Sequence, residues 1–80
     1  MSEQLPAHIY IGIGSNIDPY REIAAGLDKL ATQFGELEVS PAYLSTAIGF
    51  DGPPFINLVA GAFTHRSVDE VAALLRDIEW

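Results

Sequence analysis

Apolar residues alternate with small or polar residues over positions 8–14, a period of two that predicts a β-strand with one buried face. The isoleucines Ile9, Ile11 and Ile13 share one side of this strand. The other side carries His8, Tyr10, Gly12 and Gly14. Two glycines on one strand face predict that another group approaches the backbone closely there.

Two segments have the spacing of amphipathic helices. In the first, Asp18 is the predicted N-cap, Pro19 the first helical residue and Gly35 the stop. Its apolar stripe is Ile23, Leu27, Leu30 and Phe34. The second helix begins with a capping box formed by Ser67 and Glu70. Its apolar stripe is Val71, Leu74, Leu75 and Ile78.

Two further strands are predicted between the helices. The first covers 36–45, with Leu37 and Val39 on one face, and Pro41 within it indicates an edge position or a bulge. A connection rich in glycine and proline follows at 46–54, and connections of this length are often binding loops. The strand over 55–64 then places Phe55 and Asn57 on one face and Ile56 and Leu58 on the other.

The predicted order is therefore β-α-β-β-α over a single domain, residues 1–80. It corresponds to an α+β, ferredoxin-like sandwich that lacks the final strand, with an antiparallel sheet and two helices on one face. The strand over 8–13 is expected to form an exposed apolar edge. Pairing of this edge with a second copy around a two-fold axis, or with a complementing chain, would cover it.

Composition narrows the possible functions. Eleven acidic residues face four basic ones, which gives a formal net charge of −7, and no basic cluster exists. Binding of nucleic acid or of an anionic membrane is therefore not expected. The 80 residues contain no cysteine, no apolar stretch long enough to span a bilayer and no secretory signal, so the expected location is the cytoplasm. His8 and His65 lack partners at metal-ligand spacing, and no metal site is predicted.

Two groups of residues are candidates for ligand binding. The run from Gly12 to Asn16 forms either a backbone cradle for a ligand or a tight structural turn. Phe55 and Asn57 lie two residues apart on one strand face, where an aromatic ring and an amide suit a flat heterocycle. An ordinary aromatic residue beside an asparagine that bonds nearby backbone is the structural alternative.

Taken together, Gly12-Ile13-Gly14-Ser15-Asn16 and the later Phe55-Ile56-Asn57 resemble the N-terminal half of the 6-hydroxymethyl-7,8-dihydropterin pyrophosphokinase family of the folate pathway. The resemblance implies transfer of pyrophosphate from ATP to the pterin. It implies a pterin-binding role for residues that match the family's pocket, namely Ser45, Thr46, Ile48, Phe55 and Asn57. Glu79 matches an acidic residue close to the family's nucleotide site. The family usually has Thr-Pro where this sequence has Ser45-Thr46.

The family's arginine-rich loop and its Asp-x-Asp pair, which hold the triphosphate and magnesium, have no counterpart in these 80 residues. The resemblance therefore implies no catalytic residue and no transfer by this chain alone, with Mg²⁺ and ATP bound only if a partner chain completes the site. The alternatives are a non-catalytic module that binds a pterin or similar heterocycle, a protein-interaction module, or a fragment of a longer gene product.

Overall fold

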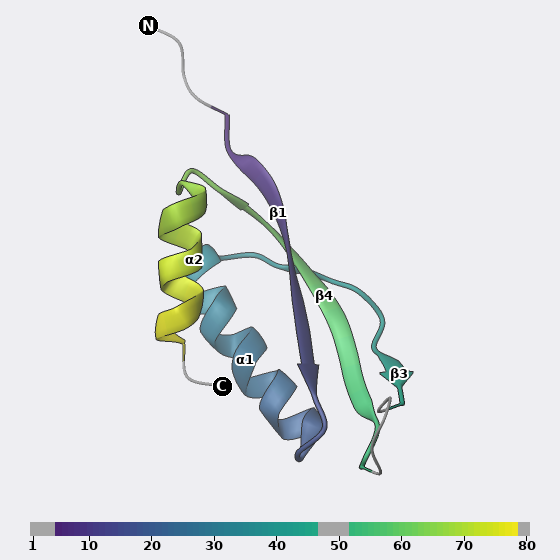
Figure 1. Cartoon of the computed structure of the whole chain (residues 1–80). Coiled ribbons are helices and arrows are strands. Elements are labelled where there is room, and N and C mark those ends of the chain that lie inside the picture. Colours follow the sequence, from purple (N-terminus) through teal and green to yellow (C-terminus); the bar gives the residue numbers. More distant parts are fainter. Residues whose placement is uncertain (1–4, 47–51, 79–80) are drawn as a thin grey trace, which may run out of the picture.

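A computed structural model of the chain describes residues 5–46 and 52–78. The elements follow the order β1 (Ala7–Ser15), α1 (Pro19–Phe34), β2 (Glu38–Val39), β3 (Tyr43–Ser45), β4 (Phe55–Thr64) and α2 (Val68–Asp77). The strands form one antiparallel sheet, and both helices lie on the same face of it (Figure 1). The predicted α+β, ferredoxin-like arrangement is confirmed.

β4 is the central strand. β1 pairs along one side of it over its whole length, from Ala7 opposite Thr64 to Ser15 opposite Ile56, while β2 and β3 pair along the other side. Within the described residues, the outer side of β1 has no neighbouring strand. The sequence-based prediction that this strand lies at the sheet edge is confirmed.

The core lies between the sheet and the helices, as the apolar periodicity predicted. Ile11 and Ile13 of β1, Leu58 of β4 and Ile23 of α1 are buried there, and Leu30 is completely buried. The second helix contributes less, because Val71, Leu74 and Leu75 are only half-buried. Ile78 enters the core just beyond the end of this helix. Neither helix in the described ranges is long and apolar enough to cross a bilayer.

The single strand predicted over 36–45 is wrong in one respect, because it is interrupted at Pro41. Val39 lies opposite Ala60 and Tyr43 lies opposite Asn57. The chain therefore advances four residues from Val39 to Tyr43 while β4 advances only three. One extra residue is therefore accommodated, as in a β-bulge. The Val59 N–H donates to Ser40 Oγ at 2.8 Å, so a hydroxyl accepts where a regular ladder would use a backbone carbonyl.

Three helix ends were predicted, and the structure agrees fully at two of them. Gly35 ends α1 with φ 80°, and Ser67 and Glu70 form the capping box of α2. Asp18 precedes α1 as predicted, but it adopts the left-handed conformation with φ 45° and its side chain caps nothing. Its carboxylate lies 3.9 Å from Arg21 instead, and its backbone carbonyl accepts a hydrogen bond from the Glu22 N–H.

Candidate functional site

The end of β1 and the start of β4 meet at the pair Gly14 and Asn57, which lie directly opposite each other. A Cβ placed on Gly14 would lie 2.5 Å from Asn57 Oδ1, closer than real side chains approach. Neither Gly14 nor Gly12 has a positive φ, and both lie within β1. The tight-turn interpretation of these glycines is therefore wrong. Gly14 is instead explained by the Asn57 amide, which occupies the space that a side chain would take.

The amide of Asn57 is fixed from its other side by β3. Asn57 Nδ2 donates to Ser45 Oγ at 2.8 Å, and β3 places Ser45 opposite Phe55. This contact depends on the bulge at Pro41. If the side chains alternated without a break from Leu37 and Val39 onward, the Ser45 side chain would point toward the helices. The extra residue directs it instead to the open face of the sheet, the face that neither helix covers.

The Asn57 amide retains hydrogen-bonding capacity. An asparagine side chain offers two N–H donors and one oxygen acceptor. Within the described part of the chain, one donor is used by Ser45, while the second donor and Oδ1 have no hydrogen-bond partner. One donor and one acceptor therefore remain free on a half-buried side chain that two strands hold in place. This pair can bind the edge of a heterocycle that presents a complementary acceptor and donor.

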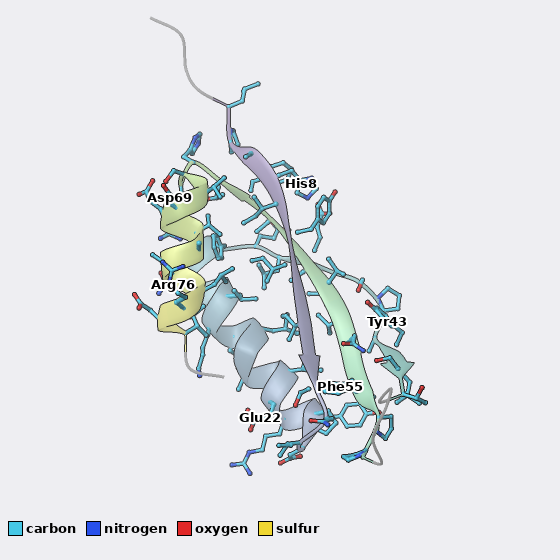
Figure 2. All side chains as sticks on the ribbon, in the orientation of Figure 1. His8, Glu22, Tyr43, Phe55, Asp69 and Arg76 are labelled. Carbon is cyan, nitrogen blue, oxygen red and sulfur yellow. The ribbon has the colours of Figure 1, made fainter. Side chains whose placement is uncertain are left out.

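A hollow of about 590 Å³ opens at the same end of the sheet, and its lining includes Gly14, the residue opposite Asn57, but neither Asn57 nor Ser45. It is lined by the end of β1, the connection to α1, the first turn of α1 and the half-buried Phe55. Figure 2 shows the Phe55 ring directed toward the end of β1, with Glu22 on the neighbouring turn of α1. The hollow therefore has an aromatic wall, an acidic side chain and a stretch of glycine-containing backbone.

The structure brings some of the predicted site residues together. Phe55 lines the hollow, and Asn57 and Ser45 form a hydrogen-bonded pair beside it. Thr46 follows Ser45 and is exposed. Ile48 and Glu79 lie outside the described residues.

Glu22 and Ile17 also line the hollow and were not predicted from the sequence. The sequence signal that could have identified them is their position. Ile17 comes just after the glycine-containing end of the first strand, and Glu22 lies in the first turn of the helix that follows. Ser15 shapes this connection, because its Oγ donates to the Ile17 carbonyl at 3.0 Å and accepts from the Ile17 N–H at 3.3 Å.

Neither histidine contributes to the hollow. His8 lies on the open face of the sheet, where it stacks on Phe63 with 4.3 Å between ring centroids and lies 4.0 Å from Glu38. His65 is exposed beyond the end of β4. Across residues 5–46 and 52–78, the structure contains no group of three or more histidine and acidic side chains arranged to hold a metal ion.

Comparison with known families identifies the relationship. Residues 10–80 match the family described as 7,8-dihydro-6-hydroxymethylpterin-pyrophosphokinase (HPPK). Comparison with curated protein sequences gave no match. The family match covers almost the whole chain, including the end of β1, the hollow and the Ser45–Asn57 pair. The chain therefore belongs to the HPPK family.

Proposed function

We propose that this chain binds the pterin ring of the substrate named by its family, with Phe55 against the ring and Asn57 at its pyrimidine edge. The observation that carries this proposal is the Asn57 amide, which is held by Ser45 and retains one donor and one acceptor beside the hollow. The flat pterin edge presents ring nitrogens, an amino group and a carbonyl, which are the complementary groups. Thr46, Ile48 and the loop that contains them complete the proposed pocket.

Pyrophosphate transfer from ATP is the reaction of the family, and it requires groups that position Mg²⁺ and neutralise the triphosphate. No lysine or arginine lines the hollow in the described residues. Arg66 donates to the Gln33 carbonyl and lies over the Phe34 ring, and Arg21 lies beside Asp18. We therefore assign Mg²⁺ and ATP binding to residues other than these 80, with Glu79 near the nucleotide. The proposed location is the cytoplasm, in keeping with a chain that has no cysteine.

The binding proposal is tested by titrating the purified chain with 6-hydroxymethyl-7,8-dihydropterin in a calorimeter. Asn57→Ala removes the donor and the acceptor, and we expect a loss of about 2 kcal/mol, or about thirtyfold in Kd. Phe55→Leu keeps an apolar side chain but removes the flat ring, and we expect a loss of about threefold to tenfold. Gln33→Ala, on an exposed residue at the other end of α1, is the matched control. Saturable binding that survives Asn57→Ala unchanged would refute the assignment.

The catalytic part of the proposal has its own assay. The chain is incubated with MgATP and the hydroxymethyl pterin, and AMP and the pterin diphosphate are measured. We expect no product from the 80-residue chain alone, because triphosphate neutralisation is assigned elsewhere. Product formation above the uncatalysed rate would overturn this assignment while leaving the pterin site intact.

A non-catalytic heterocycle-binding module is the second candidate function. The same free amide pair supports it, because a donor beside an acceptor does not by itself distinguish a pterin from another flat ring with a similar edge. Titration with pterin, guanine and adenine separates the two. Preference for guanine over the pterin would favour this second function.

A further inference from the structure

We propose that Ser40 is a positioning residue of the ligand site: its hydroxyl fixes the β-bulge that places Tyr43 and Ser45 on the face of the sheet that carries Asn57. Ser40 lies between β2 and β3 and is not among the residues that line the hollow. It acts on the site through the backbone of the strands beside it. Its effect on ligand binding rests on the proposed function, whereas its effect on the strand register does not.

The hydroxyl of Ser40 both donates and accepts a hydrogen bond. Its Oγ accepts from the Val59 N–H at 2.8 Å and donates to the Pro41 carbonyl at 3.0 Å. The backbone N–H of Ser40 donates to the Val59 carbonyl at 2.9 Å. In a regular antiparallel pair, two such residues exchange both bonds through their backbones, so the Ser40 carbonyl would accept from Val59. The Ser40 side chain therefore takes the place of its own carbonyl in the ladder.

The register of the strands on either side of Ser40 shows what this replacement changes. Continued without a break, the pairing of β2 with β4 would place Ala42 opposite Asn57. The structure places Tyr43 there instead. A shift by one residue moves every following side chain to the other face of the sheet. Tyr43 and Ser45 thereby lie on the open face, where Ser45 Oγ accepts from Asn57 Nδ2 at 2.8 Å.

Packing of β3 gives no reason for the bulge. Tyr43 is 57% exposed and Leu44 is 62% exposed, so neither side chain enters the core. In the uninterrupted register Tyr43 would face the helices, where an aromatic ring gains most from burial. The bulge instead provides the hydrogen bond between Ser45 and Asn57 and an aromatic side chain directly opposite Asn57. These are contacts of the proposed site, which explains why the chain departs from the regular strand at Ser40.

Two variants of Ser40 separate the hydroxyl from the shape of the side chain. Ser40→Thr keeps the hydroxyl, and Ser40→Val has the same branched shape without it. In Ser40→Val, the backbone carbonyl of residue 40 is the acceptor that a regular ladder supplies to the Val59 N–H. We therefore expect Ser40→Val to favour the regular register, with Ala42 opposite Asn57, and Ser40→Thr to keep the bulge.

Nuclear Overhauser contacts between β3 and β4 test the register in the free chain, without any ligand. The natural chain and Ser40→Thr should show contacts between the backbones of Tyr43 and Asn57. In Ser40→Val these contacts should weaken, and contacts between Ala42 and Asn57 should appear. Retention of the natural contacts at full strength in Ser40→Val would overturn the role of the hydroxyl.

Titration of the same variants with 6-hydroxymethyl-7,8-dihydropterin tests the effect on the site, at a temperature where circular dichroism shows each chain to be folded. We expect Ser40→Val to bind about tenfold more weakly and Ser40→Thr less than about threefold more weakly.

Gly35→Ala is the control for lost stability, because it strains the backbone at the end of α1 that lies away from the hollow. Its pterin affinity should equal that of the natural chain. A shifted register with natural affinity in Ser40→Val, or an equal loss of affinity in Gly35→Ala, would overturn the link between Ser40 and the site. Absence of pterin binding by the natural chain would refute the proposed function, and the register measurement would still decide the role of the Ser40 hydroxyl.

Discussion

Replacing Gly14 by alanine tests the central contact of the site. The new Cβ would lie 2.5 Å from Asn57 Oδ1 and 3.5 Å from Asn57 Cγ, so the amide must move. Its movement breaks the 2.8 Å hydrogen bond to Ser45, which costs about 1 kcal/mol, and pushes the side chain from its rotamer, which costs about 1 kcal/mol more. Alanine also restricts the unfolded chain, which offsets about 0.4–1 kcal/mol. We therefore expect a net destabilisation of about 1 kcal/mol.

Gly12→Ala is the matched control, because it makes the same chemical change two residues away on the same strand face. Nothing lies within 4 Å of its Cβ and its φ is not positive, so only the effect on the unfolded chain remains. We expect this variant to be more stable by about 0.4–1 kcal/mol. The two glycines should thus respond to the same substitution with opposite signs.

The assay is thermal or urea unfolding followed by far-ultraviolet circular dichroism. For a chain of this length, a change of about 1 kcal/mol shifts Tm by about 4–8 °C. The double variant Gly14→Ala with Asn57→Ala removes the clash, so it should be no less stable than Asn57→Ala alone. Equal effects at Gly12 and Gly14, or additivity in the double variant, would refute the account of how Asn57 is positioned.

Three further substitutions test the parts of the fold that hold the site. Ser40→Ala leaves the Val59 N–H without its acceptor, and we expect a loss of about 1–3 kcal/mol, largely restored by threonine, measured by urea unfolding. Gly35→Ala forces a β-carbon into a backbone with φ 80°, and we expect a loss of about 1–3 kcal/mol in the same assay. The backbone hydrogen bond from Ser67, with the side-chain bond, lowers the pKa of Glu70, so its stabilising effect should be present above about pH 4.5 and disappear as the pH falls through the lowered pKa. Glu70→Gln should therefore weaken the loss of stability on acidification, and identical pH profiles for the two chains would contradict this.

Much of the fold could be predicted because local and global preferences agree. Alternation of Ile9, Ile11 and Ile13 predicted the strand and its buried face, and the predicted helical stripe contains Leu30, which is completely buried in the core. The capping box of α2 was equally clear, since Ser67 and Glu70 satisfy each other's backbone groups. The central position of β4 follows from the antiparallel order of the elements once the ferredoxin-like topology is recognised.

The details that build the site were harder to predict. Pro41 indicated an edge or a bulge, and a bulge is present, but its effect on Ser45 depends on counting residues against β4. Without the exact register, Ser45 and Asn57 cannot be placed on one face. Asp18 has the composition of an N-cap, yet its left-handed backbone directs the carboxylate away from the helix amides. The preference of aspartate for N-cap positions does not fix the direction of its side chain, because the connection from β1 determines the backbone conformation of Asp18.

Residue types alone predicted part of the arrangement around Asn57 and Phe55. Their spacing predicted a shared face, and the two glycines of the first strand predicted a close approach to its backbone. The structure identifies the group that approaches Gly14 as the Asn57 amide. Glu22 was overlooked because an acidic residue in a first helical turn is already explained by the helix dipole. Glu22 lines the hollow because the end of β1 and the start of α1 meet there. Figure 2 shows the Glu22 side chain at the start of α1.

The most direct measurement of the central claim is the nuclear magnetic resonance signal of the Asn57 side-chain amide during titration with 6-hydroxymethyl-7,8-dihydropterin. One of its two N–H protons is bonded to Ser45 and the other is free in the structure. The account predicts a saturable downfield shift of the free proton, with the resonance of the bonded proton changing much less. Saturation of the chain by pterin with both Asn57 protons unmoved would contradict it.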